Sequence, residues 1–315
     1  MDKPLVDVRG ISRHFLAGNH VVKAVREISF TIPHQETLGV VGESGCGKST
    51  LGRTLLRLYE PTSGEFYFNG RDVFKAKGKE AFQLHKEIQM IFQDPYASLN
   101  PRMTVENIIG EGMDLHQPMP AHVRRKKIER FIEMVGLGKG VLNRYPHEFS
   151  GGQRQRIGIA RALAVKPGFI ICDEPTSALD VSIQAQIVNL LKDLQNQLGL
   201  TYLFIAHDLS VVKYMSDRVA VMYLGKIVEI GETEKIFSRP HHPYTRALLS
   251  AVPIPDPNVE RKRSRFLLKG DPPGPFQIPT GCPFHPRCPL VRSECREVEP
   301  KRKEVEKGHF VSCIL

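Results

Sequence analysis

Short apolar runs recur along the first 235 residues of the chain, and stretches with helical spacing lie between them. The N-terminal runs have the composition of β-strands and are separated by turn residues, and they fall at 5–8, 21–25, 28–32 and 38–41. Later apolar runs also predict strands, at 65–68, 88–92, 169–173, 202–206, 219–223 and 226–229. The last two runs flank Leu224 and Gly225, so they predict a hairpin.

Segments with helical spacing follow several of these strands. They fall at 49–57, 104–136, 150–163 and 182–198, and Pro118 and Pro120 interrupt the second of them. A helix between two apolar strands favours parallel pairing with a right-handed crossover, so residues 169–206 predict a parallel sheet. We therefore expect an α/β protein with an antiparallel β region near its N-terminus.

One glycine-rich stretch joins the strand predicted at 38–41 to the helix predicted at 49–57. It matches the pattern G-x-x-x-x-G-K-[ST] and consists of Gly42, Glu43, Ser44, Gly45, Cys46, Gly47, Lys48, Ser49 and Thr50. Glycines allow backbone N–H groups to surround an anion, and the positive end of the following helix points at the same place. Lys48 is expected to reach the β- and γ-phosphates of a nucleotide, and the Ser49 hydroxyl to ligate Mg²⁺. Cys46 is expected to react with a bulky maleimide, and the alternative is an inert filler.

Two adjacent acids, Asp173 and Glu174, end the strand predicted at 169–173. A carboxylate at the end of a strand, downstream of a phosphate loop, is where such folds hold Mg²⁺. Successive side chains of a strand point to opposite faces, so the two acids are free to take different roles. We expect Asp173 to bind the metal and Glu174 to orient or deprotonate a water, the alternative being a solvated turn.

Two further features are compatible with nucleotide binding. Ser150 is a suitable N-cap, and with Gly151, Gly152 and Gln153 it opens a helix whose N-terminus is a second candidate anion site. Phe15 is placed either to stack on a nucleotide base or to pack in the core.

Composition and charge narrow the class of protein. A length of 315 residues suits one large domain with an appendage, or two domains. The sequence has no apolar stretch of the ~20 residues that span a bilayer and no apolar signal core near its start, so we expect it to stay in the cytosol. The net charge of +10 is dispersed, and the basic clusters at 122–127 and 261–265 lack the interleaved aromatics of a single-strand binding groove. Nucleic acid is therefore not an expected partner, and an anionic membrane surface suits the same charge.

The motifs, taken in order, resemble those of the nucleotide-binding subunits of ATP-binding cassette (ABC) transporters. The set spans residues 5–235 and consists of the phosphate loop, Gln93, Ser150–Gln153, Asp173–Glu174, Ser177–Asp180 and His207. The signature Ser150–Gln153, lying between Gln93 and Asp173, separates this family from GTPases and helicases. Phe149 stands where the family more usually has Leu.

The resemblance implies a head-to-tail dimer in which ATP and Mg²⁺ are clamped between the phosphate loop of one subunit and the signature helix of the other. It implies that Glu174 is the catalytic base, that His207 contacts the γ-phosphate, and that Gln93 senses Mg²⁺ and the attacking water. By the same resemblance Asp180 bridges the dimer interface, and Phe15 occupies the place of the base-stacking aromatic.

The resemblance also implies partners. These are a second ABC ATPase subunit, identical or paralogous, two transmembrane permease subunits, and indirectly an extracytoplasmic substrate-binding protein. The chain would then be peripheral, on the cytoplasmic face of the cell membrane.

Finer motifs point to one branch of the family. They are QDPYASLNP at 93–101, RYPHE at 144–148, HPYTRALL at 242–249 and a C-terminal set of cysteines. Together they resemble the F-type ATP-binding subunits of dipeptide and oligopeptide importers. Relatives of this architecture import nickel or oligosaccharides, and both remain alternatives. A soluble ABC ATPase acting on nucleic acid or ribosomes is a further alternative, but the long coiled coil or tandem cassette of that type is missing here.

The expected organisation is an ABC ATPase domain at 1–235, with a helical subdomain at about 94–165, followed by a loop-rich appendage at 236–315. The appendage contains Cys282, Cys288, Cys295 and Cys313. Their spacing lacks the C-x2–4-C knuckle of zinc ribbons, and it is not the ferredoxin run either. Related peptide-importer ATPases carry a [4Fe–4S] cluster in this region, so we expect such a cluster to cross-link the appendage. Zn²⁺ and unmetallated thiols are the alternatives.

Overall fold

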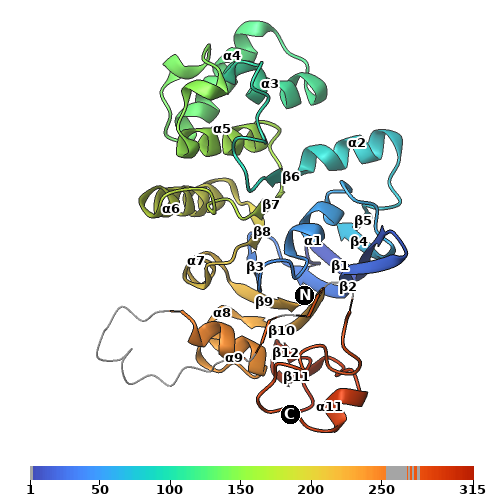
Figure 1. The fold of residues 1–315 in the computed structure, drawn as a ribbon. Coiled ribbons are helices and arrows are strands. Elements are labelled where there is room, and N and C mark those ends of the chain that lie inside the picture. The colour runs from blue at the N-terminus through green and yellow to red at the C-terminus, as the bar shows by residue number, and fades with distance from the viewer. Residues whose placement is uncertain (1–2, 253–267, 269, 272, 275–276) are drawn as a thin grey trace. The chain divides into compact units, whose positions relative to one another are not determined.

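The computed structural model describes the whole chain except residues 1–2, 253–267, 269, 272 and 275–276 (Figure 1). The chain divides into two compact units. Unit 1 comprises Met1–Leu5, Ile32–Glu36 and Tyr67–Ile205, and unit 2 comprises Val6–Thr31, Thr37–Phe66 and Ala206–Leu315. The basic cluster at 261–265 lies outside the described residues.

Unit 1 contains the parallel pairing predicted from residues 169–206. Strand β7 (Phe169–Asp173) pairs in parallel with β6 (Ile88–Ile91) on one side and with β8 (Thr201–Ile205) on the other. Every residue of β7 and β8 is buried, which explains why these runs are mostly apolar, with only Asp173 and Thr201 as polar residues at strand ends. Helix α6 (Val181–Leu198) connects β7 to β8, and Tyr202 Oη donates a hydrogen bond to the carbonyl of Leu191 at 3.0 Å.

The helices of unit 1 include α3 (Val105–His116), α4 (Ala121–Met134) and α5 (Gly151–Ala164), which lie together in Figure 1. Both α3 and α4 pack on α5, and their apolar faces are buried. The prolines at 118 and 120 separate α3 from α4, as expected. Helix α2 (Gly78–Glu87), strand β5 (Arg71–Asp72) and the 3-10 turns Lys139–Val141 and Pro146–Glu148 complete the unit and were not predicted.

The N-terminal strands of unit 2 are longer than the sequence pattern indicated. β1 (Val6–Ala17) and β2 (His20–Ile32) are neighbours joined by a two-residue turn, which makes them antiparallel, and β4 (Ser63–Phe68) lies on the other side of β1. The two strands predicted at 21–25 and 28–32 are one strand, so that prediction was wrong. Glu27 interrupts the pattern because its backbone is left-handed, at φ 49°, and its N–H donates to Ser12 Oγ.

A second sheet of unit 2 contains β3 (Thr37–Val41), β9 (Arg218–Tyr223) and β10 (Lys226–Glu232). β3 and β9 are parallel, and β9 and β10 form the predicted hairpin. Helix α1 (Lys48–Leu55) follows the phosphate loop, and α7 (Leu209–Met215) packs on β3.

The appendage contains more regular structure than the expected loops. β12 (His309–Val311) pairs antiparallel with β10, and β11 (Lys303–Glu306) pairs with β12. In its described residues the helices are α8 (Thr233–Ser238), α9 (Pro243–Ser250) and α11 (Glu294–Glu297). These elements are short and carry several polar residues, so they leave little periodic signal in the sequence.

A buried carboxylate ties these C-terminal elements to the sheet. Glu229 on β10 accepts hydrogen bonds from the backbone N–H groups of His241 and His242, at 2.7 and 3.0 Å, and lies 2.8 Å from His309 Nε2. Glu229 and His309 are almost completely buried. The start of α9 and strand β12 are therefore both fixed to β10 through one side chain.

Among the described residues, no helix combines the length and the apolar character needed to cross a membrane.

A glycine in β3 provides a test of the packing in unit 2. A Cβ on Gly39 would lie 2.3 Å from Ser216 Oγ and 2.7 Å from Val212 Cγ1, so Gly39→Ala forces α7 away from the strand. We expect the substitution to lower the free energy of unfolding by about 1–3 kcal/mol, measured by urea denaturation. Gly138→Ala is the matched control, because nothing lies within 4 Å of the added methyl group. Equal stabilities for the two variants would contradict the packing described here.

Candidate functional site

The phosphate loop of unit 2 has a backbone that only glycine accommodates at key positions. Gly47 has φ 106°, and a Cβ there would lie 2.1 Å from the carbonyl oxygen of Ala24. A Cβ on Gly42 would lie 2.3 Å from the carbonyl oxygen of Met222. The loop is thus pressed between β2 and β9 in a conformation that side chains would prevent.

Lys48 is the first residue of α1, and its ammonium turns back over the loop. Its side chain is almost fully buried, and Nζ donates to the carbonyls of Gly42 at 2.8 Å and Glu43 at 3.1 Å. No side chain caps the N-terminus of α1, and no acidic residue lies in its first turn. A cation and a helix N-terminus at one place form an environment for an anion, as expected from the sequence.

The candidate catalytic residues of unit 1 lie at the carboxyl ends of β6 and β7. Gln93 Nε2 donates a hydrogen bond to Glu174 Oε2 at 2.8 Å, so the structure brings these two predicted residues together. Glu174 has φ 45°, a strained conformation for a residue with a side chain, and its N–H donates to the carbonyl of Ile205. Asp173 is completely buried, and a buried carboxylate requires a cation or hydrogen bonds to replace its hydration. These features fit the predicted metal and water-activating roles, which stay predictions.

The signature Ser150–Gln153 begins α5 with a complete capping box. Ser150 Oγ accepts the N–H of Gln153, and Gln153 Oε1 accepts the N–H of Ser150. Both side chains are exposed. A Cβ on Gly152 would lie 2.5 Å from Ile183 Cγ2, so this glycine allows α5 to approach α6 closely.

The remaining predicted site residues are more exposed. His207 follows β8, and Asp180 is the N-cap residue of α6 without a capping hydrogen bond from its side chain. Phe15 on β1 is half-buried and packs edge-on against the ring of Tyr59. The guanidinium carbon Cζ of Arg13 lies 4.4 Å from the centroid of the Phe15 ring. Base stacking by Phe15 stays a prediction.

The surroundings of Cys46 do not favour the reactivity expected of it. It is only 5% exposed, and burial raises the pKa of its thiol, although the charge of Lys48 acts in the opposite direction. Burial both hides the sulfur from reagents and disfavours its ionisation, and the accessible thiolate is the form that reacts with maleimides. The alternative interpretation, an inert filler, therefore fits this residue better.

The four C-terminal thiols lie close enough for the charges on them to interact. Burial raises the pKa of Cys282 to about 11, and the charges of Cys288, Cys295 and Cys313 act in the same direction. Burial also raises the pKa of Cys288 and of Cys313. All four are free thiols, and the Arg292 N–H donates to Cys295 Sγ. Cysteine sulfurs are soft ligands that lose their protons when a metal ion binds. Four of them in one segment are therefore chemically suited to an iron–sulfur group or Zn²⁺.

The positions of these thiols do not confirm the predicted cluster. Within the part of the chain that the structure describes, no three His, Cys, Asp or Glu side chains are placed to hold a metal ion. The [4Fe–4S] cluster is therefore unsupported and stays a hypothesis.

Two residues near the phosphate loop were missed from the sequence. Tyr244, the third residue of the HPYTRALL motif, accepts the backbone N–H of Glu43 on its Oη at 2.9 Å. Arg287, which lies between two of the cysteines, forms a bidentate ion pair with the Glu43 carboxylate. One unused signal was available, because Pro243 at the first position of α9, after His242, is typical of a helix N-terminus.

Comparison with known families defines the class of protein. The family description "ABC transporter" matches residues 25–177, which include the phosphate loop and the signature. The description "Oligopeptide/dipeptide transporter, C-terminal region" matches residues 228–295, which include α9 and Arg287. The fold and the site are those of an ABC ATPase.

Similarity to whole proteins gives the branch of the family. The chain is 55% identical over 315 residues to the oligopeptide transport ATP-binding protein OppF of Bacillus subtilis, covering 99% of this chain and 97% of that protein. It is 54% identical over 295 residues to AppF, an oligopeptide transport ATP-binding protein of the same organism, covering 93% and 90%. The chain therefore belongs to the ATP-binding proteins of ABC transporters, in the oligopeptide and dipeptide transporter group.

Solved structures agree with this assignment. The ATP-binding cassette MJ0796, in a dimeric post-hydrolysis state bound to ADP and Pi, superposes with a TM-score of 0.67 at 28% identity, covering 72% of this chain and 98% of that chain. CbiO1 of Clostridium perfringens, part of the ABC transporter complex cbiONQ, also gives 0.67, at 27% identity and with 76% and 92% covered.

Proposed function

We propose that the chain is the ATP-hydrolysing subunit of an ABC importer that takes up dipeptides or oligopeptides. The observation that carries this proposal is full-length similarity to oligopeptide transport ATP-binding proteins, which includes the C-terminal segment specific to that group. Residues 1–235 supply the ATPase, and residues 236–315 form the appendage of this branch.

The residues take the roles that the family motif gives them. Lys48 and the amides of the phosphate loop bind the β- and γ-phosphates, and Ser49, Gln93 and Asp173 hold Mg²⁺. Glu174 accepts the proton of the attacking water, and the hydrogen bond from Gln93 orients its carboxylate. His207 contacts the γ-phosphate, and Phe15 stacks on the base.

A second cassette completes the site. The exposed N-terminus of α5 carries Ser150 and Gln153, which are available to a neighbouring subunit. MJ0796 is dimeric in its solved structures. In a head-to-tail dimer, this helix N-terminus supplies amide donors to the γ-phosphate bound on the other subunit. Closure of the dimer then depends on bound ATP, and hydrolysis of the ATP allows the two cassettes to separate.

Two permease subunits are the membrane partners, and they place the chain on the cytoplasmic face of the cell membrane. The contact is proposed to involve residues 94–112 and the helices that follow. Tyr96 and Leu115 are more than half exposed in this part of unit 1, as a partner surface requires.

Replacing the proposed catalytic base, Glu174, tests the role of ATP hydrolysis directly. Glu174→Gln removes a proton acceptor while keeping the shape of the side chain, so hydrolysis should fall by ~10²-fold or more and MgATP binding should persist. The measurements are phosphate release and equilibrium dialysis of MgATP with the full chain, with Glu80→Gln, on the exposed side of α2, as the control.

The same variant tests the transported solute. Cells that depend on this importer should lose uptake of labelled dipeptide when Glu174→Gln replaces the natural chain. Hydrolysis near the wild-type rate would contradict the role of the base. Loss of nickel or oligosaccharide uptake, with peptide uptake unchanged, would contradict the proposed solute.

We also propose that Cys282, Cys288, Cys295 and Cys313 hold a [4Fe–4S] cluster with a structural role. The proposal rests on the resemblance to peptide-importer ATPases and on four soft sulfur donors in one segment, two of them buried (Cys282 and Cys295), because the described residues show no arrangement ready for a metal. When bound, the cluster would cross-link the appendage.

Metal content decides this second proposal. Chain purified anaerobically should contain about four iron and four sulfide per chain and show sulfide-to-iron charge-transfer absorption. Cys295→Ser should lose the iron, and Cys46→Ser should keep it. Zinc without sulfide, or no metal at all, would contradict the iron–sulfur assignment.

A further inference from the structure

Glu43 of the phosphate loop is held by two side chains from the C-terminal segment. Arg287 Nη1 and Nη2 donate to the two carboxylate oxygens of Glu43, at 2.8 and 3.0 Å. Tyr244 Oη accepts the backbone N–H of the same residue at 2.9 Å. Both the side chain and the peptide group of Glu43 are therefore fixed by residues about 200 and 244 positions later in the chain.

The two side chains are themselves held rigidly. Tyr244 is completely buried, and its ring packs against Tyr223 and Phe284, with centroid distances of 4.7 and 5.4 Å. Its position at the start of α9 is set by His242, whose Nδ1 accepts the Tyr244 N–H. Burial lowers the pKa of His242 to about 3, so the ring stays neutral and able to accept this bond.

Arg287 is fixed by the turn that carries two of the cysteines. Its backbone N–H donates to the carbonyl of Phe284, and the His285 N–H donates to that of Cys282. Its Nε also donates to the carbonyl of Gly270, and the side chain is only 7% exposed. A buried, bidentate guanidinium with this many partners has one geometry, so it defines the position of the carboxylate it binds.

Fixing Glu43 also fixes the phosphate-binding lysine. The Glu43 carbonyl accepts hydrogen bonds from Lys48 Nζ at 3.1 Å and from the Cys46 N–H at 3.3 Å. A shift of the Glu43 peptide therefore moves both the ammonium and the backbone of the loop. The contacts run in one series, from Arg287 and Tyr244 through Glu43 to Lys48.

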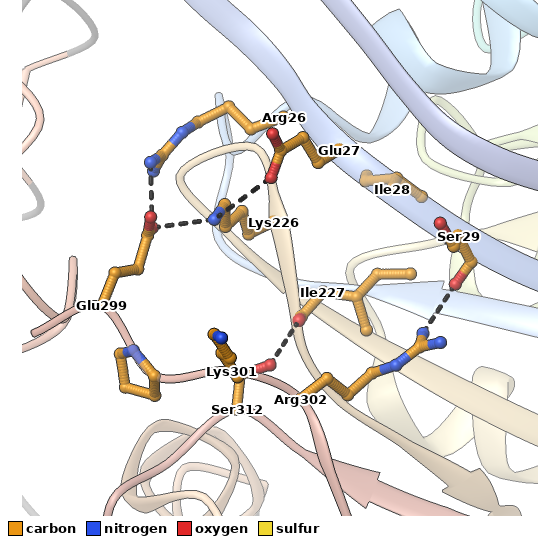
Figure 2. Close-up of a pocket in the computed structure, with 11 residues that line it drawn as sticks. Arg26, Glu27, Ile28, Ser29, Lys226, Ile227, Glu299, Lys301, Arg302 and Ser312 are labelled. Carbon is orange, nitrogen blue, oxygen red and sulfur yellow. Dashed lines mark hydrogen bonds and ion pairs between the residues drawn. The ribbon is translucent and has the colours of Figure 1, made fainter. Parts of the chain in front are cut away.

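The C-terminal segment is attached to the same unit at a second place, around a hollow of ≈ 450 Å³ (Figure 2). Glu299 accepts from Arg26 Nη2 at 2.9 Å and pairs with Lys226 at 2.9 Å, and Arg302 donates to the Ser29 carbonyl at 2.8 Å. These contacts hold the segment against β2 and β10 without touching the phosphate loop. They offer a control for contacts that merely stabilise the segment.

We propose that Arg287 is a positioning residue for ATP binding: it acts through Glu43 to hold the phosphate loop and Lys48 in the form that accepts the triphosphate. Tyr244 performs the same task on the Glu43 backbone. This inference rests on the proposed function. It assigns a role in nucleotide binding to a segment that lies outside the ATPase motifs.

The experiment compares Arg287→Met with Arg302→Met in the full chain. Arg287→Met should raise the Kd for MgATP by about tenfold or more, because loss of the bidentate pair frees Glu43 and, through its carbonyl, Lys48 to move by about 1 Å from the position that binds phosphate. Arg302→Met, which removes a contact remote from the loop, should bind as the natural chain does. The two variants should unfold at similar temperatures.

A double-mutant cycle separates positioning from a general structural effect. Glu43→Gln should weaken MgATP binding. The double variant Glu43→Gln/Arg287→Met should bind MgATP about as well as the worse of the two single variants, because both substitutions break the same ion pair. Arg287→Lys should restore only part of the affinity, since an ammonium lacks the bidentate geometry. If Arg287→Met unfolds, Tyr244→Phe removes only the Oη contact and should still raise the Kd.

Two results would overturn the inference. One is a Kd for MgATP in both Arg287→Met and Tyr244→Phe that equals that of the unsubstituted chain. The other is a loss of MgATP affinity in the Glu43→Gln/Arg287→Met double variant that equals the sum of the losses in the two single variants. Failure of the natural chain to bind MgATP would instead contradict the proposed function, so the two failures are distinguishable.

Discussion

The conformation of the phosphate loop is the constraint on which the rest of the structure depends. Gly47 presses against the carbonyl of Ala24 and Gly42 against that of Met222, so two strands of unit 2 shape the loop from both sides. Lys48 closes it by donating to carbonyls of the loop itself. The ammonium of Lys48 and the uncapped N-terminus of α1 therefore lie at a single place, which is an environment that suits a triphosphate.

The sequence reveals local parts of this site better than distant ones. The phosphate loop, the N-cap at Ser150 and the two acids at the end of β7 are predictable because each is a short motif whose geometry follows from its neighbours. Parallel pairing of β7 and β8 is predictable because both strands are mostly apolar and a helix lies between them in the sequence.

Other features depend on contacts between residues far apart in the chain. The ion pair between Arg287 and Glu43 spans 244 positions, and nothing in either local sequence indicates it. The single strand β2 was mistaken for two because Glu27 adopts a left-handed backbone inside it. Burial disfavours the reactivity expected of Cys46, and that burial arises from packing that the motif does not encode.

The central claim is that two half-sites for ATP, one at a phosphate loop and one at a signature helix, meet across a subunit boundary. The most direct measurement places a photo-crosslinker on Ser150→Cys in complexes locked with ATP by Glu174→Gln, and maps its products by mass spectrometry. We predict ATP-dependent crosslinks to residues 42–49 of the neighbouring ATPase subunit, or to the same motif of a paralogue. Crosslinks that never reach the neighbour's phosphate loop, with ATP bound, would contradict the account.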